Sequence, residues 1–377
     1  MNTTPGWRIP FTGLQRQYNN LRDEILDSTD QVLQSGQLMN GPWTAKFENW
    51  LAVRNGVKNA VTCHSGTQAL EIIAEYWRGL ELTNKPPRVL IPSLTFVATA
   101  NAFLRAGWDI HFVDVDVNGI LDTEKIPQGL DYQAVVLVGL YGADVSHAHS
   151  VTAWTHSVTA WTHWVHRNVT VIEDAAQNWL GNNGLRTGEG SAISFDPMKN
   201  LACYGNGGAV VTDNSDLADF ARAWGNHNKG DYKAERGGSN SRMSELDCAH
   251  MMVKTQYIDQ WQARRRRIAA YMCERFENTS IRCLINEQNE HRHAFHKFVI
   301  DVDQRNQLQE KLWDASIDTR IHYAQPLHDD SVLRQFTGPT MLSVATALSQ
   351  RVLSLPIYPE LSDSEVEYVT DQVLKNV

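Results

Sequence analysis

One lysine and a glycine-rich turn lie in the stretch Ser194-Phe-Asp-Pro-Met-Lys199-Asn-Leu-Ala-Cys-Tyr-Gly205-Asn-Gly207-Gly208-Ala-Val-Val211. The turn separates two short apolar runs that have the pattern of buried strands. A lysine in such surroundings is desolvated, which can lower its pKa and make it a Schiff-base nucleophile. The alternative is that Lys199 is a surface lysine in a β-hairpin.

Outward from this stretch, short apolar runs alternate with helical patterns over the first two thirds of the chain. Such alternation is typical of β-α-β units around a mainly parallel sheet, and so predicts the α/β class. The expected strands are 60–62, 88–91, 109–113, 134–138, 170–172, 192–195 and 209–212. Ligands of open α/β sheets bind in the loops that follow such strands.

From about Ile258 the pattern changes. It predicts a long helix over 261–276, a strand over 293–300 and helices near 305–315 and over 363–376. We therefore expect three parts, which are an N-terminal segment (1–20), a large α/β domain (21–255) and a smaller C-terminal α+β domain (256–377).

The composition is that of a globular chain, with 42% hydrophobic and 20% charged residues among 377, which excludes a disordered or fibrous protein. The net charge of −9 disfavours a nucleic-acid partner, and we interpret the basic run 264–267 as a solvated helix face. No apolar stretch predicts an export signal or a membrane anchor. Five scattered cysteines signal neither a disulfide framework nor a zinc site, so we expect a cytoplasmic protein.

A seven-residue repeat occupies 150–163, where Ser-Val-Thr-Ala-Trp-Thr-His occurs twice in succession. Seven residues are about two helical turns, so the repeat lengthens a helix without turning its apolar face. His156 and His163 could ligate a metal from one face. No carboxylate or cysteine cluster completes such a site, and we expect no metal.

An acidic pair ends the strand that precedes Ala-Ala-Gln177. A buried Asp174 that faced a pyridine nitrogen would keep this nitrogen protonated, which lets pyridoxal phosphate (PLP) act as an electron sink. The alternative is that Asp174 caps a following helix.

Two further motifs follow strands. Cys63-His-Ser-Gly66-Thr67-Gln-Ala-Leu70 is a strand-turn-helix junction whose free backbone N–H groups could hold a phosphate, although helix caps look similar. Phe96 comes just after a strand and could stack on a planar cofactor, or it could belong to the core.

In this order the motifs resemble the DegT-type (DegT/DnrJ/StrS) sugar aminotransferases, which are fold-type I PLP enzymes. The resemblance extends over nearly the whole chain and also includes 41–48, Asn226-His227, 238–243 and 353–359. It implies a large domain with a mainly parallel sheet flanked by helices.

The resemblance also implies roles for individual residues. Lys199 would hold PLP and move protons, and Asp174 would pair with the ring nitrogen. The other cofactor contacts would be Gln177 at the ring hydroxyl, Phe96 on the ring, Gly66, Thr67 and Ser194 at the phosphate, and Asn226 at the phosphate of a partner subunit in a homodimer.

The implied reaction is ping-pong. An amino acid, L-glutamate by expectation, converts PLP to pyridoxamine phosphate, which then aminates a keto-deoxysugar attached to a nucleotide. The loop 317–328 resembles the family's sugar-recognition segment, with His322, Tyr323 and His328 as substrate contacts, and its Ile-His-Tyr form favours carbon 3 over carbon 4. The alternatives are amination of a keto-cyclitol and a PLP-binding protein without turnover.

The chain departs from the family pattern in three places. Relatives commonly have His-Leu-Tyr-Gly where this chain has Gly139-Leu-Tyr-Gly, and Asn206 and Ser241 replace the usual Glu and Tyr. These changes affect substrate contacts and leave the cofactor motifs complete.

Overall fold

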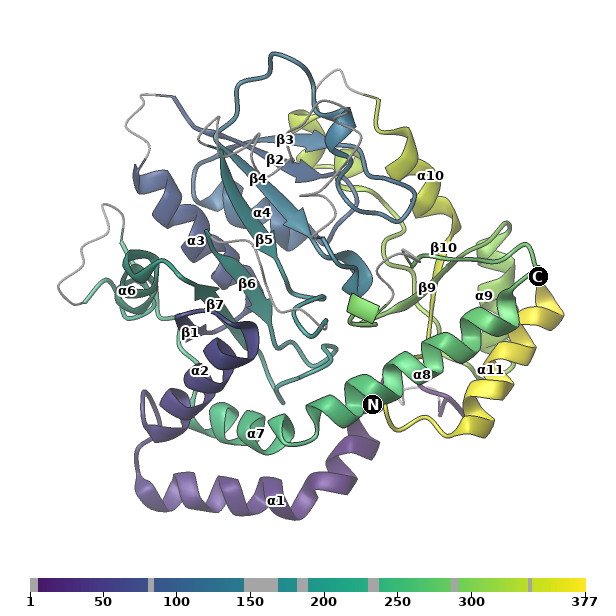
Figure 1. Cartoon of the computed structure of the whole chain (residues 1–377), viewed down its shortest axis with the longest axis horizontal. Helices are drawn as coiled ribbons and strands as arrows, with labels where there is room; N and C mark the ends of the chain where they lie inside the picture. Colours follow the sequence, from purple (N-terminus) through teal and green to yellow (C-terminus); the bar gives the residue numbers. More distant parts are fainter. Residues whose placement is uncertain are drawn as a thin grey trace.

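The computed structural model describes residues 6–80, 85–145, 169–181, 189–229, 237–285, 291–337 and 341–377. Seven strands form one sheet in the order β1-β7-β6-β5-β4-β2-β3 (Figure 1). Their bounds are Asn59–Cys63 (β1), Arg88–Pro92 (β2), Asp109–Val113 (β3), Ala134–Val138 (β4), Thr170–Asp174 (β5), Ser191–Ser194 (β6) and Gly208–Thr212 (β7). Each expected strand of the large domain is therefore present.

The sheet is mainly parallel, as predicted. Strands β3, β2, β4, β5 and β6 run in parallel, whereas β7 is antiparallel to both of its neighbours, β6 and β1. The central strands are buried and rich in Val, Ile and Leu, as strands covered on both faces are. The carboxyl ends of β1, β2, β5 and β6 consequently meet at one edge.

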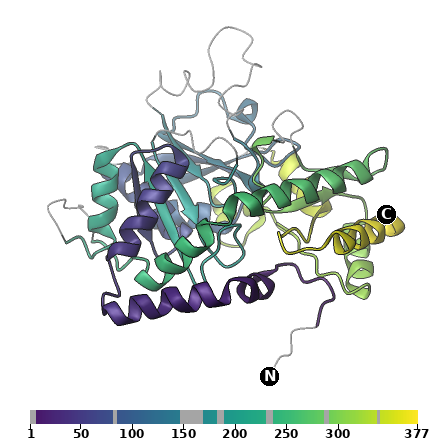
Figure 2. The ribbon, with the colours of Figure 1, turned by 60° about the horizontal axis from the view of Figure 1, so that its bottom comes forward.

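Helices cover both faces of this sheet. One layer contributes Ile72, Phe103 and Leu217 to a core, and the other contributes Leu21 and Met251 to a second core. The first layer comprises α3 (Gly66–Leu80), α4 (Val97–Arg105) and α6 (Ser215–Trp224), and the second comprises α1 (Leu14–Ser35), α2 (Pro42–Asn55) and α7 (Glu245–Thr255). Figure 2 shows α1 on the outer side of the second layer, against α7.

A second, antiparallel sheet of order β10-β9-β8 lies beside the large one (Figure 1). Its elements are α8 (Ile258–Phe276), β8 (Arg282–Cys283), β9 (Phe298–Asp301), α9 (Arg305–Asp314), β10 (Val352–Leu355) and α11 (Asp363–Asn376). They enclose a third core. Helix α10 (Ser343–Arg351) packs on the core of the large sheet instead, and the domain boundary at 255/256 stays a prediction.

Two local expectations are wrong. The strand expected over 293–300 begins only at Phe298, because the N–H groups of Ala294 and Lys297 donate to the carbonyls of Gly142 and Tyr141, which belong to another loop. The basic run 264–267 is not a fully solvated face.

The exception in that run is Arg265, which is buried. It donates hydrogen bonds to the carbonyl oxygens of Phe295 and Ile357. The guanidinium therefore connects two loops of the third core instead of facing water.

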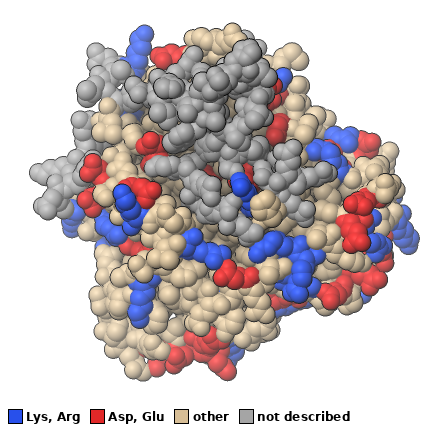
Figure 3. Space-filling model, in the orientation of Figure 1, with Lys and Arg blue, Asp and Glu red and all other residues tan. Residues whose placement is uncertain are grey.

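The repeat 150–163, with His156 and His163, lies outside the described residues. Within the described ranges, no helix is long and apolar enough to cross a membrane, and no group of three His, Cys, Asp or Glu side chains could hold a metal. The five cysteines are free thiols. Acidic and basic side chains are interspersed over the face in Figure 3.

Candidate active site

A cavity of about 320 Å³ opens at the edge of the sheet where β1, β2, β5 and β6 end. Open α/β sheets bind their ligands at this edge. Nine of the predicted site residues line it, namely Gly66, Thr67, Phe96, Asp174, Gln177, Ser194, Lys199, His322 and Tyr323. The chain thus brings together residues that are up to 257 positions apart (323 − 66).

Asp174 is the last residue of β5 and is only 6% exposed. The hydroxyl of Thr99 donates to its Oδ2 over 2.7 Å, and the N–H of Ala176 donates to its Oδ1 over 3.2 Å. Burial raises the pKa of Asp174, while these hydrogen bonds and the charge of Lys199 act in the opposite direction. A turn follows at 176–180 rather than a helix, so the interpretation of Asp174 as a helix cap is wrong.

Lys199 lies in the connection between β6 and β7. Its backbone N–H closes a turn by donating to the carbonyl oxygen of Asp196 over 2.8 Å. The two strands are antiparallel, as expected for the alternative that places Lys199 in a β-hairpin. The side chain of Lys199 nevertheless lines the cavity and does not lie on the surface. Burial lowers the pKa of Lys199, and the carboxylates of Asp174 and Asp196 oppose this shift.

Glycines bring three segments into contact at the start of α3. A Cβ on Gly66 would lie 2.6 Å from the Cβ of Ser194, and a Cβ on Gly208 would lie 2.3 Å from the carbonyl carbon of Ser65. The first N–H groups of a helix have no partner within the helix. Together with Thr67 and Ser194, they form a concave set of donors suited to an anion.

Aromatic side chains form the opposite part of the cavity. The ring centres of Phe96 and Tyr323 lie 5.9 Å apart, and Phe96 is 53% exposed. The phenol of Tyr323 forms a hydrogen bond with Gln177, whose Oε1 accepts the N–H of Tyr141 over 2.7 Å. This chain of contacts fixes the amide of Gln177 at the cavity wall.

His322 packs its ring against Phe11, with 5.8 Å between the ring centres. Its Nδ1 lies 2.8 Å from the hydroxyl oxygen of Ser354. Burial, with the charges of Lys297 and Lys199, lowers the pKa of His322 to about 3. The imidazole is therefore neutral at physiological pH.

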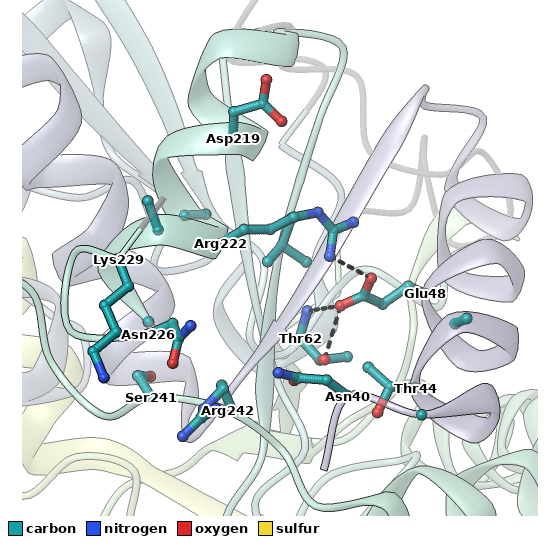
Figure 4. A pocket seen from close by; sticks show the side chains of 16 residues that line it. Asn40, Thr44, Glu48, Thr62, Asp219, Arg222, Asn226, Lys229, Ser241 and Arg242 are labelled. Carbon is teal, nitrogen blue, oxygen red and sulfur yellow. Dashed lines mark hydrogen bonds and ion pairs between the residues drawn. The ribbon is translucent and has the colours of Figure 1, made fainter. Parts of the chain in front are cut away.

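Two predicted site residues lie elsewhere. Asn226 lines a separate cavity of about 730 Å³ that is bordered by α2, β1 and α6, where Arg222 points toward Glu48 (Figure 4). His328 is not among the residues that line the Lys199 cavity, and its Nε2 lies 3.1 Å from the hydroxyl oxygen of Thr346.

Sequence patterns missed three residues at the site. Thr99 follows Phe96 by three residues, about one helical turn into α4. Its spacing from Phe96 therefore could have predicted that it lies near the site. Tyr141 lies in the Gly139-Leu-Tyr-Gly segment, but only the tertiary fold shows that its N–H contacts Gln177. Lys297 carries no local signal, because tertiary contacts alone bring it to the cavity.

Gly139 is explained by its neighbour. A Cβ at this position would lie 2.1 Å from the Cγ of Asn178. The amide of Asn178 donates to Glu173 over 2.9 Å. A histidine at 139 is therefore incompatible with Asn178 in its present position.

The model of the DegT/DnrJ/EryC1/StrS aminotransferase family matches residues 19–374. Two relatives cover nearly the whole chain. The erythromycin biosynthesis sensory transduction protein EryC1 of Saccharopolyspora erythraea is 33% identical, over 96% of this chain and 97% of that protein. The dTDP-3-amino-3,6-dideoxy-alpha-D-galactopyranose transaminase of Aneurinibacillus thermoaerophilus is 32% identical, over 97% and 98%.

The fold is shared with solved structures. The crystal structure of S. venezuelae DesV in complex with a ketimine intermediate aligns with a TM-score of 0.86, at 28% identity and over 98% of each chain. The similarity therefore extends over both sheets.

Proposed function

Because the chain belongs to the DegT/DnrJ/EryC1/StrS aminotransferase family, whose enzymes depend on PLP, we propose that it transfers an amino group from L-glutamate to a nucleotide-linked keto-deoxysugar. One observation carries this proposal. A lysine whose pKa is lowered by burial shares a cavity with a buried aspartate and with the glycine-lined start of a helix.

The residues present fit PLP. Its phosphate matches the donors at the start of α3, where Gly66 leaves no room for a side chain beside Ser194. Its ring nitrogen needs an anionic partner, and Asp174 supplies a buried carboxylate that Thr99 supports. Phe96, half exposed at the same cavity, offers a flat face for the ring.

PLP, when bound, supplies an electron sink that stabilises negative charge at the carbon next to the transferred nitrogen. Asp174 holds the proton on the ring nitrogen through its negative charge. Lys199 would bind the cofactor through Nζ, and its freed amine would then move a proton between the substrate carbon and the cofactor. A lysine of lowered pKa suits this role because less free energy is needed to reach its neutral, nucleophilic amine.

His322 and Tyr323 are our candidates for contacts to the sugar. Both line the cavity, and the neutral imidazole of His322 can either donate or accept a hydrogen bond. The relative from Aneurinibacillus is named for a 3-amino sugar, which favours carbon 3 as the site of amination. A contact from His328 would require a longer substrate that reaches beyond the cavity, such as one carrying a nucleotide.

A homodimer would complete the site. Asn226 lies outside the Lys199 cavity of its own chain, and Phe96, which lines that cavity, is half exposed. In the proposed dimer Asn226 reaches the phosphate bound by the partner subunit. We place the enzyme in the cytoplasm, where its five thiols stay reduced.

The test is product analysis. The protein is incubated with PLP and 15N-labelled L-glutamate, together with dTDP- or UDP-linked 3-keto or 4-keto sugars, and the products are examined by mass spectrometry and NMR. We expect 15N at carbon 3 of a nucleotide sugar. Amination of a free keto-cyclitol but of no nucleotide sugar would reject the proposed substrate, and no amination at all would favour a protein that binds PLP without turnover.

A further inference from the structure

A second lysine, Lys297, lines the cavity that holds Lys199. It directly precedes β9, and its N–H is anchored on the carbonyl oxygen of Tyr141 over 3.0 Å. The residue is only 5% exposed, and its Nζ lies 4.7 Å from the centre of the Phe11 ring. No residue in the described ranges forms an ion pair or a hydrogen bond with its side chain.

The charges around Lys297 are mostly positive. Burial lowers its pKa well below the usual value, and Lys199, Arg265 and Arg320 lower it further, while Asp196 alone acts in the opposite direction. A buried ammonium without a counter-ion is costly. An anion that entered the cavity beside Lys297 would therefore be stabilised.

This anion is not the phosphate of the cofactor. The phosphate donors proposed above lie at the start of helix α3, whereas Lys297 directly precedes β9 of the second sheet and has Phe11 and His322 as neighbours. His322 is neutral and supplies no charge. With Lys199 committed to the cofactor, the side chain of Lys297 stays available for a substrate, and a carboxylate beside it would favour its charged ammonium form.

We propose that Lys297 is a carboxylate-binding residue, which forms an ion pair with a carboxylate of a substrate. The proposal rests on the function proposed above, because an amino acid must enter this cavity in the first half-reaction. Two sources share the chemistry: every amino-acid donor carries a carboxylate, and so does a sugar oxidised at its terminal carbon. A charged hydrogen bond in a desolvated cavity contributes roughly tenfold to a hundredfold in affinity.

The experiment compares pairs of ligands in which one member carries a carboxylate and the other a neutral polar group in its place. Calorimetry on the PLP-loaded protein measures the Kd of glutarate against the diamide glutaramide, and the Kd of UDP-glucuronate against UDP-glucose. The variants are Lys297→Met, which keeps the length of the side chain without its charge, and Lys297→Arg, which keeps the charge. The absorption band of lysine-linked PLP checks that each variant retains the cofactor site, and Lys297→Gln replaces Lys297→Met if the latter does not fold.

We expect wild type to prefer at least one carboxylate by roughly tenfold or more, Lys297→Met to lose this preference and Lys297→Arg to keep most of it. A preference for glutarate assigns Lys297 to the donor, and a preference for the glucuronate assigns it to the sugar. Absence of both preferences in wild type, or their persistence in Lys297→Met, would overturn the proposal. An intact preference in a protein that transaminates nothing would reject the proposed function alone.

Discussion

The pKa of Asp174 depends on the hydrogen bonds that its carboxylate accepts. The carboxylate is buried in a site where burial favours its neutral form, yet the proposed role requires its charge. Thr99 donates to one oxygen and the N–H of Ala176 donates to the other. Because both donors favour the ionised form, they keep the carboxylate charged at a lower pH than burial alone would allow.

Thr99→Val should therefore shift the pH dependence of turnover. Loss of the hydroxyl raises the pKa of Asp174 further, so the carboxylate becomes protonated at a higher pH. We expect the acidic limb of the kcat profile to move to higher pH, whereas Thr99→Ser should stay close to wild type. An unchanged limb in Thr99→Val would show that Asp174 does not control the rate.

At the scale of elements, the start of α3 is built for close approach. Gly66 contacts Ser194 of β6 with no space for a Cβ, and one of the atoms in the way is the Cα of Ser194, 3.1 Å from the Cβ position. A flexible side chain could move aside, but backbone cannot without displacing the strand. The placement of the donors at this helix start beside the hydroxyl of Ser194 thus requires glycine at position 66.

Gly66→Ala should weaken PLP binding by roughly tenfold or more, since a shift of even a few tenths of an ångström misplaces several charge-assisted hydrogen bonds. Gly79→Ala is the matched control, because it lies in the same helix and its Cβ would meet nothing within 4 Å. Equilibrium titration with PLP measures both. Equal affinities in the two variants would contradict the proposed phosphate site.

The N-terminus of helix α2 is capped by a carboxylate from another helix. Glu245, at the start of α7, accepts the N–H groups of Gly41, Trp43 and Thr44. The hydroxyl of Thr44 also donates to this carboxylate. Burial would raise the pKa of Glu245, but these hydrogen bonds outweigh it, and its pKa is lowered.

Glu245→Gln should lower the free energy of unfolding by about 1–3 kcal/mol near neutral pH. Because folding lowers the pKa of Glu245, its ionised carboxylate stabilises the fold fully above the pKa of an unfolded glutamate, about 4.3. This stabilisation is lost as the pH falls through the pKa of Glu245 in the folded state. The free energy of unfolding of the variant should therefore fall less steeply with decreasing pH than that of wild type. Denaturant unfolding at several pH values measures the free energy of unfolding of each protein, with Glu310→Gln, at an exposed residue, as control. If wild type and Glu245→Gln still differed by the same free energy at low pH, the ionised carboxylate of Glu245 would not be what stabilises the start of α2.

At the scale of the whole molecule, the site extends beyond one chain in our proposal. Lys199 and Asn226 line different cavities of the same subunit. If the sites are shared, each contains Lys199 of one subunit and Asn226 of the other.

Hybrid dimers test this sharing. Lys199→Ala and Asn226→Ala proteins should each be nearly inactive, the second through weak cofactor binding. When the two are unfolded together and refolded, a hybrid dimer carries one intact and one doubly altered site, so part of the activity should return. Activity no higher than the sum of the separate variants would place Asn226 outside a shared site.

The sequence predicted the elements better than their contacts. All seven strands of the large sheet and the helix 363–376 follow from apolar periodicity, which local residues determine. Residues 293–297 do not form the expected strand, since the N–H groups of Ala294 and Lys297 pair with a segment more than 150 positions earlier. For the same reason the sequence did not predict Lys297 at the site or the contact of Tyr141 with Gln177, while Lys199 and Asp174 lay in recognisable motifs.

The most direct test of the account is the visible absorption spectrum of the PLP-loaded protein before and after L-glutamate, with Lys199→Ala as control. We expect the band of lysine-linked PLP in wild type, its replacement by the pyridoxamine phosphate spectrum after glutamate, and no such band in the variant. A wild-type band that no amino-acid donor discharges would contradict the assignment of this chain as a working aminotransferase.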